Sequence, residues 1–282
     1  MRIVITGALG QLGQTLRFVL KHHDLTLTDL PETDITDREA IEDVIHSAQA
    51  ELVIHCAAYT DVDGCARNPK LAYQVNALGT QNIALCCMKY GAELLHVSTN
   101  EVFRGDRQEG YQEWMPLAPA NSYGTSKAMA ESYILNHLSR YYIVRTSWLY
   151  SRIGHNFIHA ILDKARRDGE IRVVTDEIAN PTYVKDLADA IAALIDTHHY
   201  GIYHFTNEGS CSRWEFANEI IRLAGLVDVK NTPIVSADYM RVSNPPPYAA
   251  LHNINGSLIG ITLRPWQEAL ADYISSEVQN DT

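Results

Sequence analysis

The N-terminal segment holds the feature that most constrains the fold. A short β-branched run, residues 2–6, breaks directly into the glycine loop Gly7-Ala8-Leu9-Gly10-Gln11-Leu12-Gly13, and a helical pattern of apolar residues follows. Glycine at these positions permits a tight turn, a close approach of the backbone to a ligand and close helix–strand packing. The helix N-terminus behind the loop offers unpaired N–H groups to a pyrophosphate. A purely structural turn is the alternative, but strand, loop and helix in this order predict a dinucleotide site.

The rest of the chain alternates between strand-like and helix-like patterns. Residues 52–58 form a nearly continuous apolar run, as in strands that are buried on both faces of a parallel sheet. The repeated alternation predicts an α/β fold with a Rossmann-type doubly wound parallel sheet, right-handed crossovers and a smaller C-terminal substrate-binding lobe. The expected strands are residues 2–6, 25–28, 52–58, 93–98, 141–145, 171–174 and 201–205.

The same patterns suggest a domain division. We expect a dinucleotide-binding domain over residues 1–150 and mainly a substrate-binding lobe over 151–282, with 171–207 returning to the first sheet. A proline cluster at 244–248 predicts a loop, which is either a stiff surface turn or a wall of the substrate pocket.

Charge and composition exclude several classes of partner. The 282 residues contain 23 Lys plus Arg against 34 Asp plus Glu, a net charge of −11, which argues against nucleic-acid and anionic-membrane binding. No apolar run approaches the roughly 20 residues that a bilayer requires, and the N-terminus lacks a signal-peptide pattern. The five cysteines include no Cys-x-x-Cys pair. We therefore expect a cytoplasmic protein with reduced thiols and no metal site.

The ends of the expected strands carry the candidate cofactor residues, because ligands in such sheets bind beyond the carboxyl ends. Asp29 ends the second strand, where a carboxylate accepts from a ribose 2′-OH and repels a 2′-phosphate; this slightly favours NADH over NADPH. A solvated loop carboxylate is the alternative for Asp29. The expected cofactor-binding residues are Gly7, Gly10, Gln11, Leu12, Gly13, Asp29, Asp34, Ile35, Ala57, Ala58, Thr60, Tyr123 and Lys127.

A tyrosine and a lysine stand four residues apart in Tyr123-Gly124-Thr125-Ser126-Lys127, which places them on one face of a helix. An ammonium near a phenol lowers the pKa of the phenol from about 10, and such a phenol can exchange a proton with an oxygen during hydride transfer. Alone, the pair is typical of an ordinary amphipathic helix. Thr99 follows the fourth strand, and its hydroxyl can donate to a substrate carbonyl oxygen beside the phenol.

The glycine loop, Ser98-Thr99 and the Tyr123–Lys127 pair together resemble an extended short-chain dehydrogenase/reductase. Further segments follow the pattern of the dTDP-4-dehydrorhamnose reductases, and the resemblance covers essentially the whole chain. These segments are residues 10–13, 57–63, 75–77, 145–150, 156–157, 180–184, 201–204, 214–217 and 263–268.

The resemblance implies NAD(P)H-dependent reduction of the C4 ketone of a dTDP-linked 4-keto-6-deoxysugar, the last step towards dTDP-L-rhamnose. It implies a catalytic set of Thr99, Tyr123 and Lys127, and a substrate site of Thr99, Asn100, Glu101, Tyr123 and Trp148. For Trp148, a core aromatic is the alternative. The resemblance is also compatible with a homodimer. Some relatives carry acidic residues for a divalent ion where this chain has Thr15, so no metal is expected there.

Two departures from the family pattern bear on the substrate. Asn100-Glu101 replaces the usual Asp-Tyr, and Asn244 stands where an arginine is expected. Glutamate after this strand is found in nucleotide-sugar 4,6-dehydratases, but Asn100 removes their proton-donating acid. Losing the arginine weakens diphosphate binding unless Arg241 or another base substitutes. Reduction of a different ketone and a non-catalytic cofactor-binding regulatory subunit therefore stay open, although the intact catalytic set argues against the latter.

Overall fold

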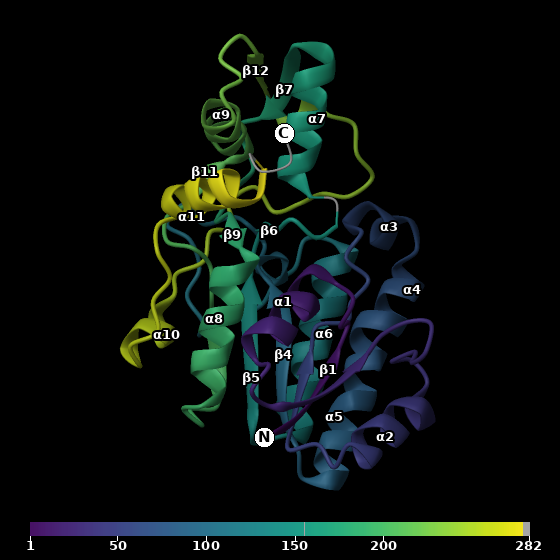
Figure 1. Ribbon diagram of the computed structural model, residues 1–282. Coiled ribbons are helices and arrows are strands. Elements are labelled where there is room, and N and C mark those ends of the chain that lie inside the picture. Colours follow the sequence, from purple (N-terminus) through teal and green to yellow (C-terminus); the bar gives the residue numbers. More distant parts are fainter. Residues whose placement is uncertain (155, 279–282) are drawn as a thin grey trace.

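The computed structural model describes residues 1–154 and 156–278, and it confirms the predicted α/β fold. Its centre is a six-stranded sheet in the order β10-β5-β4-β3-β1-β2, with every neighbouring pair parallel (Figure 1). The strands are β1 (Arg2–Thr6), β2 (Asp24–Thr28), β3 (Leu52–His55), β4 (Glu93–Thr99), β5 (Tyr141–Thr146) and β10 (Gly201–His204).

Helices cover both faces of this sheet. On one face α1 (Gln11–Val19) packs against α8 (Val184–Ile195); on the other, α5 (Gly79–Tyr90) packs against both α2 (Arg38–Ser47) and α6 (Ser122–His137). Alternate residues of a strand pack against the two helix layers, because successive side chains of a strand point to opposite faces of the sheet. The central strands are therefore apolar on both faces, as in Ile3-Val4-Ile5 of β1 and Leu52-Val53-Ile54 of β3.

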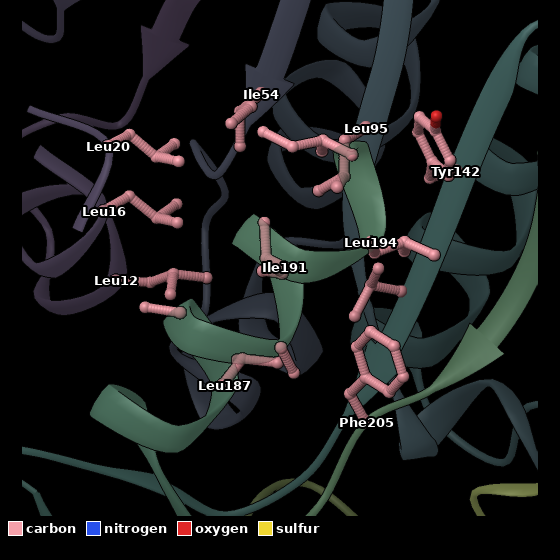
Figure 2. Packing of buried hydrophobic residues seen from close by; sticks show 14 of the residues in the cluster. Leu12, Leu16, Leu20, Ile54, Leu95, Tyr142, Leu187, Ile191, Leu194 and Phe205 are labelled. Atoms are coloured by element: carbon pink, nitrogen blue, oxygen red, sulfur yellow. The ribbon is translucent and has the colours of Figure 1, made fainter. Parts of the chain in front are cut away.

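The β1 strand shows this division. Its Ile3 and Ile5 lie in one buried cluster with α1 and α8, whereas Val4 lies in another with α2 and α5. Figure 2 shows Leu12 and Leu16 of α1, and the adjoining Leu20, facing the side chains of α8.

The chain is helical from Pro69 to Tyr90, in three consecutive segments. These are α4 (Pro69–Ala72), the π-helical η1 (Tyr73–Leu78) and α5. Within the described residues, no helix combines the length and the apolar character that crossing a membrane requires.

A smaller lobe sits beyond one end of the sheet and carries its own buried cluster, which includes Tyr150, Phe216 and Trp266. Its helices include α7 (Phe157–Asp168), α9 (Arg213–Leu223) and α11 (Trp266–Tyr273). Short strand pairs lie beside them: β6 (Leu149–Tyr150) with β9 (Thr182–Tyr183), β8 (Ile178–Ala179) with β11 (Cys211–Ser212), and β7 (Glu170–Val174) with β12 (Lys230–Ile234). The remaining elements are α3 (Val62–Arg67), η2 (Asn100–Val102), η3 (Ser236–Asp238), α10 (Ile254–Leu258) and η4 (Ile274–Val278).

The expectation that residues 171–207 return to the first sheet is only partly correct. β10 is an edge strand of the six-stranded sheet, but β7 pairs with β12 in the smaller lobe. Burial along β7 alternates, with Glu170 and Arg172 exposed, as in a strand with one solvated face rather than in a strand buried on both. The domain division at residue 150 stays a prediction.

A buried ion pair ties α6 to the sheet. The Arg145 guanidinium on β5 lies 2.7 Å from the Glu131 carboxylate on α6, and their side chains are 2% and 0% exposed. Ser98 on β4 also donates a hydrogen bond to Glu131, at 2.6 Å. Because α6 also carries Tyr123 and Lys127, this pair fixes the helix that presents them.

Candidate active site

A cavity of about 820 Å³ lies at the carboxyl ends of the sheet strands and extends to the smaller lobe. Its size is that of a small-molecule site, and its place is where ligands bind in such sheets. The structure brings the complete set of residues that the sequence predicted for the site to the border of this one cavity. They are Gly7, Gly10, Gln11, Leu12, Gly13, Asp29, Asp34, Ile35, Ala57, Ala58, Thr60, Thr99, Asn100, Glu101, Tyr123, Lys127 and Trp148.

The glycine loop has the shape of a dinucleotide cradle. Gly7 adopts φ +69°, and a Cβ there would lie 2.5 Å from the backbone nitrogen of Ala57. A Cβ on Gly13 would lie 2.3 Å from the Gly7 carbonyl oxygen, whereas one on Gly10 would meet that oxygen at 3.2 Å. Gly10, the N-cap residue of α1, has no side chain that could accept from the first N–H groups of the helix, so these groups remain available to an anion. The loop therefore fits the pyrophosphate of a dinucleotide.

Alanine substitutions at Gly10 and Gly13 should separate ligand binding from folding. Gly13→Ala forces a methyl group into the Gly7 backbone, so we expect it to lower the free energy of unfolding by about 1–3 kcal/mol. Gly10→Ala should cost less stability, because its methyl would meet the Gly7 oxygen at 3.2 Å rather than 2.3 Å, yet weaken NADPH binding at least about tenfold by crowding the pyrophosphate. Urea unfolding and NADPH fluorescence titration measure the two effects. Unchanged NADPH affinity in Gly10→Ala would contradict the assigned role of the loop.

Asp29 is held in place by the backbone. Its two carboxylate oxygens accept from the Leu9 and Leu30 N–H groups, both at 2.8 Å. The side chain therefore anchors the glycine loop as well as placing a negative charge where β2 ends, so the alternative of a freely solvated loop carboxylate does not describe it.

The three expected catalytic residues meet on β4 and α6. Asn121 begins α6 by accepting from the Gly124 N–H at 2.8 Å, and this cap sets the direction in which the half-buried Tyr123 leaves the helix. Lys127 is 2% exposed and donates to the Val97 carbonyl oxygen at 2.7 Å. Thr99, at the end of β4, also borders the cavity.

The electrostatics of Tyr123 differ from the sequence-based expectation. Burial raises the pKa of Tyr123 above its ordinary value, the Glu101 carboxylate raises it further, and a hydrogen bond with Thr99 acts in the opposite direction. The expectation that Lys127 lowers this pKa is therefore wrong for the chain by itself. Burial instead lowers the pKa of Lys127, to about 8. A phenol with a raised pKa stays protonated at neutral pH, as a proton donor must.

Asn100 and Glu101, the departures from the family pattern, have different surroundings. The Asn100 amide donates to the Ala249 carbonyl at 3.1 Å and accepts from Thr99 at 3.2 Å, so it joins the end of β4 to the C-terminal loop. Glu101 accepts from Asn121 at 2.6 Å. Burial raises the pKa of Glu101, and the Asn121 hydrogen bond lowers it.

Asn76 is a positioning residue to which the sequence interpretation gave no role. Its side chain accepts from the Tyr59 N–H at 2.7 Å and donates to the Tyr59 carbonyl at 3.0 Å and to Ser126 at 2.9 Å. Asn76 lies in the π-helical segment, and such segments are frequent at functional sites. It joins the loop after β3 to α6, beside Tyr123. The available signal was Val75-Asn76-Ala77, one of the segments that follow the family pattern.

Trp148 and Arg213 form the lobe side of the cavity. Trp148 has φ +42°, a left-handed conformation that is costly for a large side chain and is typical of functional sites. The Arg213 guanidinium lies 3.6 Å from the centre of the Trp148 ring and 4.7 Å from that of Phe157. Arg213 was absent from the predicted site, although the adjoining residues 214–217 follow the family pattern.

Comparisons with known proteins agree with this geometry. Residues 1–279 match the model of the RmlD substrate binding domain. A Mycobacterium tuberculosis protein named dTDP-4-dehydrorhamnose reductase is 38% identical over 98% of this chain and 93% of its own length. The crystal structure of a Clostridium acetobutylicum dTDP-4-dehydrorhamnose reductase superposes with a TM-score of 0.95 at 38% identity, covering 98% of this chain and 99% of the other. The Bacillus anthracis enzyme of that name, in complex with NADP, gives 0.94 at 39% identity, with 97% and 98% covered.

These matches span the chain from the glycine loop to the smaller lobe, as the resemblance inferred from the sequence does. The chain therefore belongs to the RmlD substrate binding domain family, among the extended short-chain dehydrogenases/reductases that include the dTDP-4-dehydrorhamnose reductases.

Proposed function

We propose that this protein is an NAD(P)H-dependent ketoreductase that reduces the C4 ketone of a dTDP-linked 4-keto-6-deoxysugar. The observation that carries the proposal is the single cavity that joins the glycine loop to Thr99, Tyr123 and Lys127. Family membership and the names of relatives identical at 38–39% support the same reaction.

In the proposed reaction, Tyr123 donates the phenolic proton to the C4 oxygen as this oxygen becomes an alkoxide. The chemistry that a reduced nicotinamide supplies when bound is hydride transfer to the C4 carbon. Thr99 donates a hydrogen bond to the same oxygen, where negative charge develops. Lys127, fixed by the Val97 carbonyl, holds the nicotinamide ribose. Trp148 and Glu101 border the part of the cavity that receives the sugar.

Both NADH and NADPH are candidate cofactors. The Asp29 charge at the end of β2 favours NADH, because it repels a 2′-phosphate. The Bacillus anthracis relative is in complex with NADP. The slight preference for NADH stays a prediction, as do a homodimer and a cytoplasmic location.

The lowered pKa of Lys127 predicts a pH dependence. Because burial lowers this pKa to about 8, the ammonium loses its proton as the pH rises through that value. We expect kcat/KM to fall above about pH 8, while Tyr123, whose pKa is raised, keeps its proton. A profile from about pH 6 to about pH 10 measures this, with circular dichroism as the control for folding. A rate that keeps rising through pH 10 would contradict a catalytic ammonium.

The direct test of the substrate is to mix the purified protein with NADH or NADPH and the dTDP-4-keto-6-deoxysugar and to follow nicotinamide absorbance. We expect oxidation of the cofactor. Absence of oxidation, even after an epimerase has been added to supply the other epimer, would refute this substrate.

A second candidate is the same reduction of a different ketone. It is favoured by Asn244, which stands where a diphosphate-binding arginine is expected. A panel of ketones separates the two. Cofactor binding without turnover on any ketone would instead indicate a regulatory subunit.

A further inference from the structure

The lobe end of the cavity carries an unusual set of charges for a site that receives a diphosphate. Glu101 borders the cavity. Glu177 contacts two arginines, Arg213 and Arg241, and Asp63 contacts Arg241. A diphosphate brings further negative charge towards these carboxylates, so its binding requires a cation that can reach it.

Arg241 is engaged elsewhere. Its guanidinium lies 3.5 Å from the Asp63 carboxylate and 3.4 Å from that of Glu177, so two anions neutralise it. Ser243 donates to the Asp63 carboxylate from both its N–H, at 3.0 Å, and its hydroxyl. These bonds attach the loop that contains Arg241 and Ser243 to Asp63. Arg241 is also not among the described residues that border the cavity. It therefore stabilises the loop and does not compensate for Asn244.

Arg213 has the opposite surroundings. It borders the cavity, and its one carboxylate contact within the described residues, with Glu177, is long at 3.9 Å. The face of its guanidinium stacks on Trp148, which leaves the N–H donors at the edge of the plane free to bind an anion. Burial lowers the pKa of Arg213 to about 10, so the group is still charged at neutral pH.

We propose that Arg213 binds the phosphate that is joined directly to the sugar of the substrate, in the role that the arginine expected at position 244 would have. This inference rests on the proposed function. Arg213 lies against Trp148, and it interacts electrostatically with Glu101, so it belongs to the sugar end of the cavity rather than to the nucleoside end. In a nucleoside diphosphate sugar, the β-phosphate is the anionic group nearest to the sugar. Arg213 is thereby a residue that selects diphosphate-linked sugars over free sugars and monophosphates.

The test compares the binding of dTDP and dTMP by calorimetry with NADPH present, because only dTDP carries the β-phosphate. Arg213→Met should weaken dTDP binding about tenfold or more and leave dTMP binding within about twofold, since a charge-assisted hydrogen bond is lost only with dTDP. Arg213→Lys, which keeps the charge but not the planar fork, should show a smaller loss that is still selective for dTDP. Arg222→Met is the matched control: it lies on the same helix, is 65% exposed and pairs with Glu219, and should change neither affinity.

The outcomes distinguish this inference from the proposed function. If the unaltered protein binds dTDP and Arg213→Met binds it equally well, or loses dTDP and dTMP alike, the role of Arg213 is refuted and the reductase assignment stands. If the unaltered protein does not bind dTDP at all, both the role of Arg213 and the assignment of a dTDP-linked substrate are refuted. NADPH affinity and thermal unfolding report whether Arg213→Met folds; if it does not, Arg213→Lys alone decides.

Discussion

Replacing Tyr123 with phenylalanine is expected to lower kcat about a hundredfold to ten-thousandfold while leaving the affinity for NADPH nearly unchanged. The phenol is the proposed donor to the C4 oxygen, and its raised pKa shows that the environment keeps the proton in place at neutral pH. Phenylalanine preserves the ring but removes the proton. Steady-state kinetics and fluorescence titration with NADPH measure the two quantities.

Two further variants make this result specific. Tyr133→Phe, on the same helix, removes a hydroxyl that bonds only to Tyr73 among the contacts described at that site, and it should leave turnover nearly normal. Lys127→Ala should weaken both turnover and cofactor binding, because its ammonium is assigned to the nicotinamide ribose. A Tyr123→Phe enzyme with a near-normal rate would show that the proton comes from another group.

The largest effect on stability is expected from Glu131→Gln. This change leaves the Arg145 guanidinium charged and only 2% exposed, without its carboxylate partner. Removing one member of a buried ion pair typically costs about 3–5 kcal/mol, because the remaining charge stays desolvated. Urea unfolding should show this loss. Since the pair ties α6 to β5, the variant should also lose turnover.

An exposed pair provides the control. Lys185 and Asp189 lie one helical turn apart on α8, with side chains 58% and 52% exposed. Asp189→Asn should change the free energy of unfolding by less than about 0.5 kcal/mol, because solvent screens such pairs. If Glu131→Gln is no more costly than Asp189→Asn, the ion pair does not hold α6 in place.

Much of the fold could be predicted because its determinants are local. The glycine loop can be identified from its residue types, and the apolar runs of β1, β3 and β4 indicate burial on both faces of a parallel sheet. The parallel sheet in turn places the ends of these strands together. For this reason, the predicted residues at Asp29, Ala57 and Thr99 border one cavity.

The errors and omissions concern contacts between distant segments. β7 pairs with β12, a strand that lies far from it in the sequence, and a strand pattern alone does not identify its partner. The charged residues Glu170 and Arg172, which are exposed, were nevertheless a usable signal against a fully buried strand. The raised pKa of Tyr123 results from burial and from Glu101, neither of which helix spacing reveals. Arg213 joins the site only because the fold of the smaller lobe brings its guanidinium onto the Trp148 ring, a contact that the sequence does not reveal.

The most direct test is to locate the transferred hydride. The protein is incubated with the dTDP-4-keto-6-deoxysugar and NADPH that is deuterated at the reactive carbon of the nicotinamide, and the product is examined by NMR and mass spectrometry. We predict that a single deuterium appears at C4 of the sugar and that Tyr123→Phe nearly abolishes its incorporation. Deuterium at another carbon, or none in the sugar while the cofactor is oxidised, would contradict C4 ketone reduction at this site.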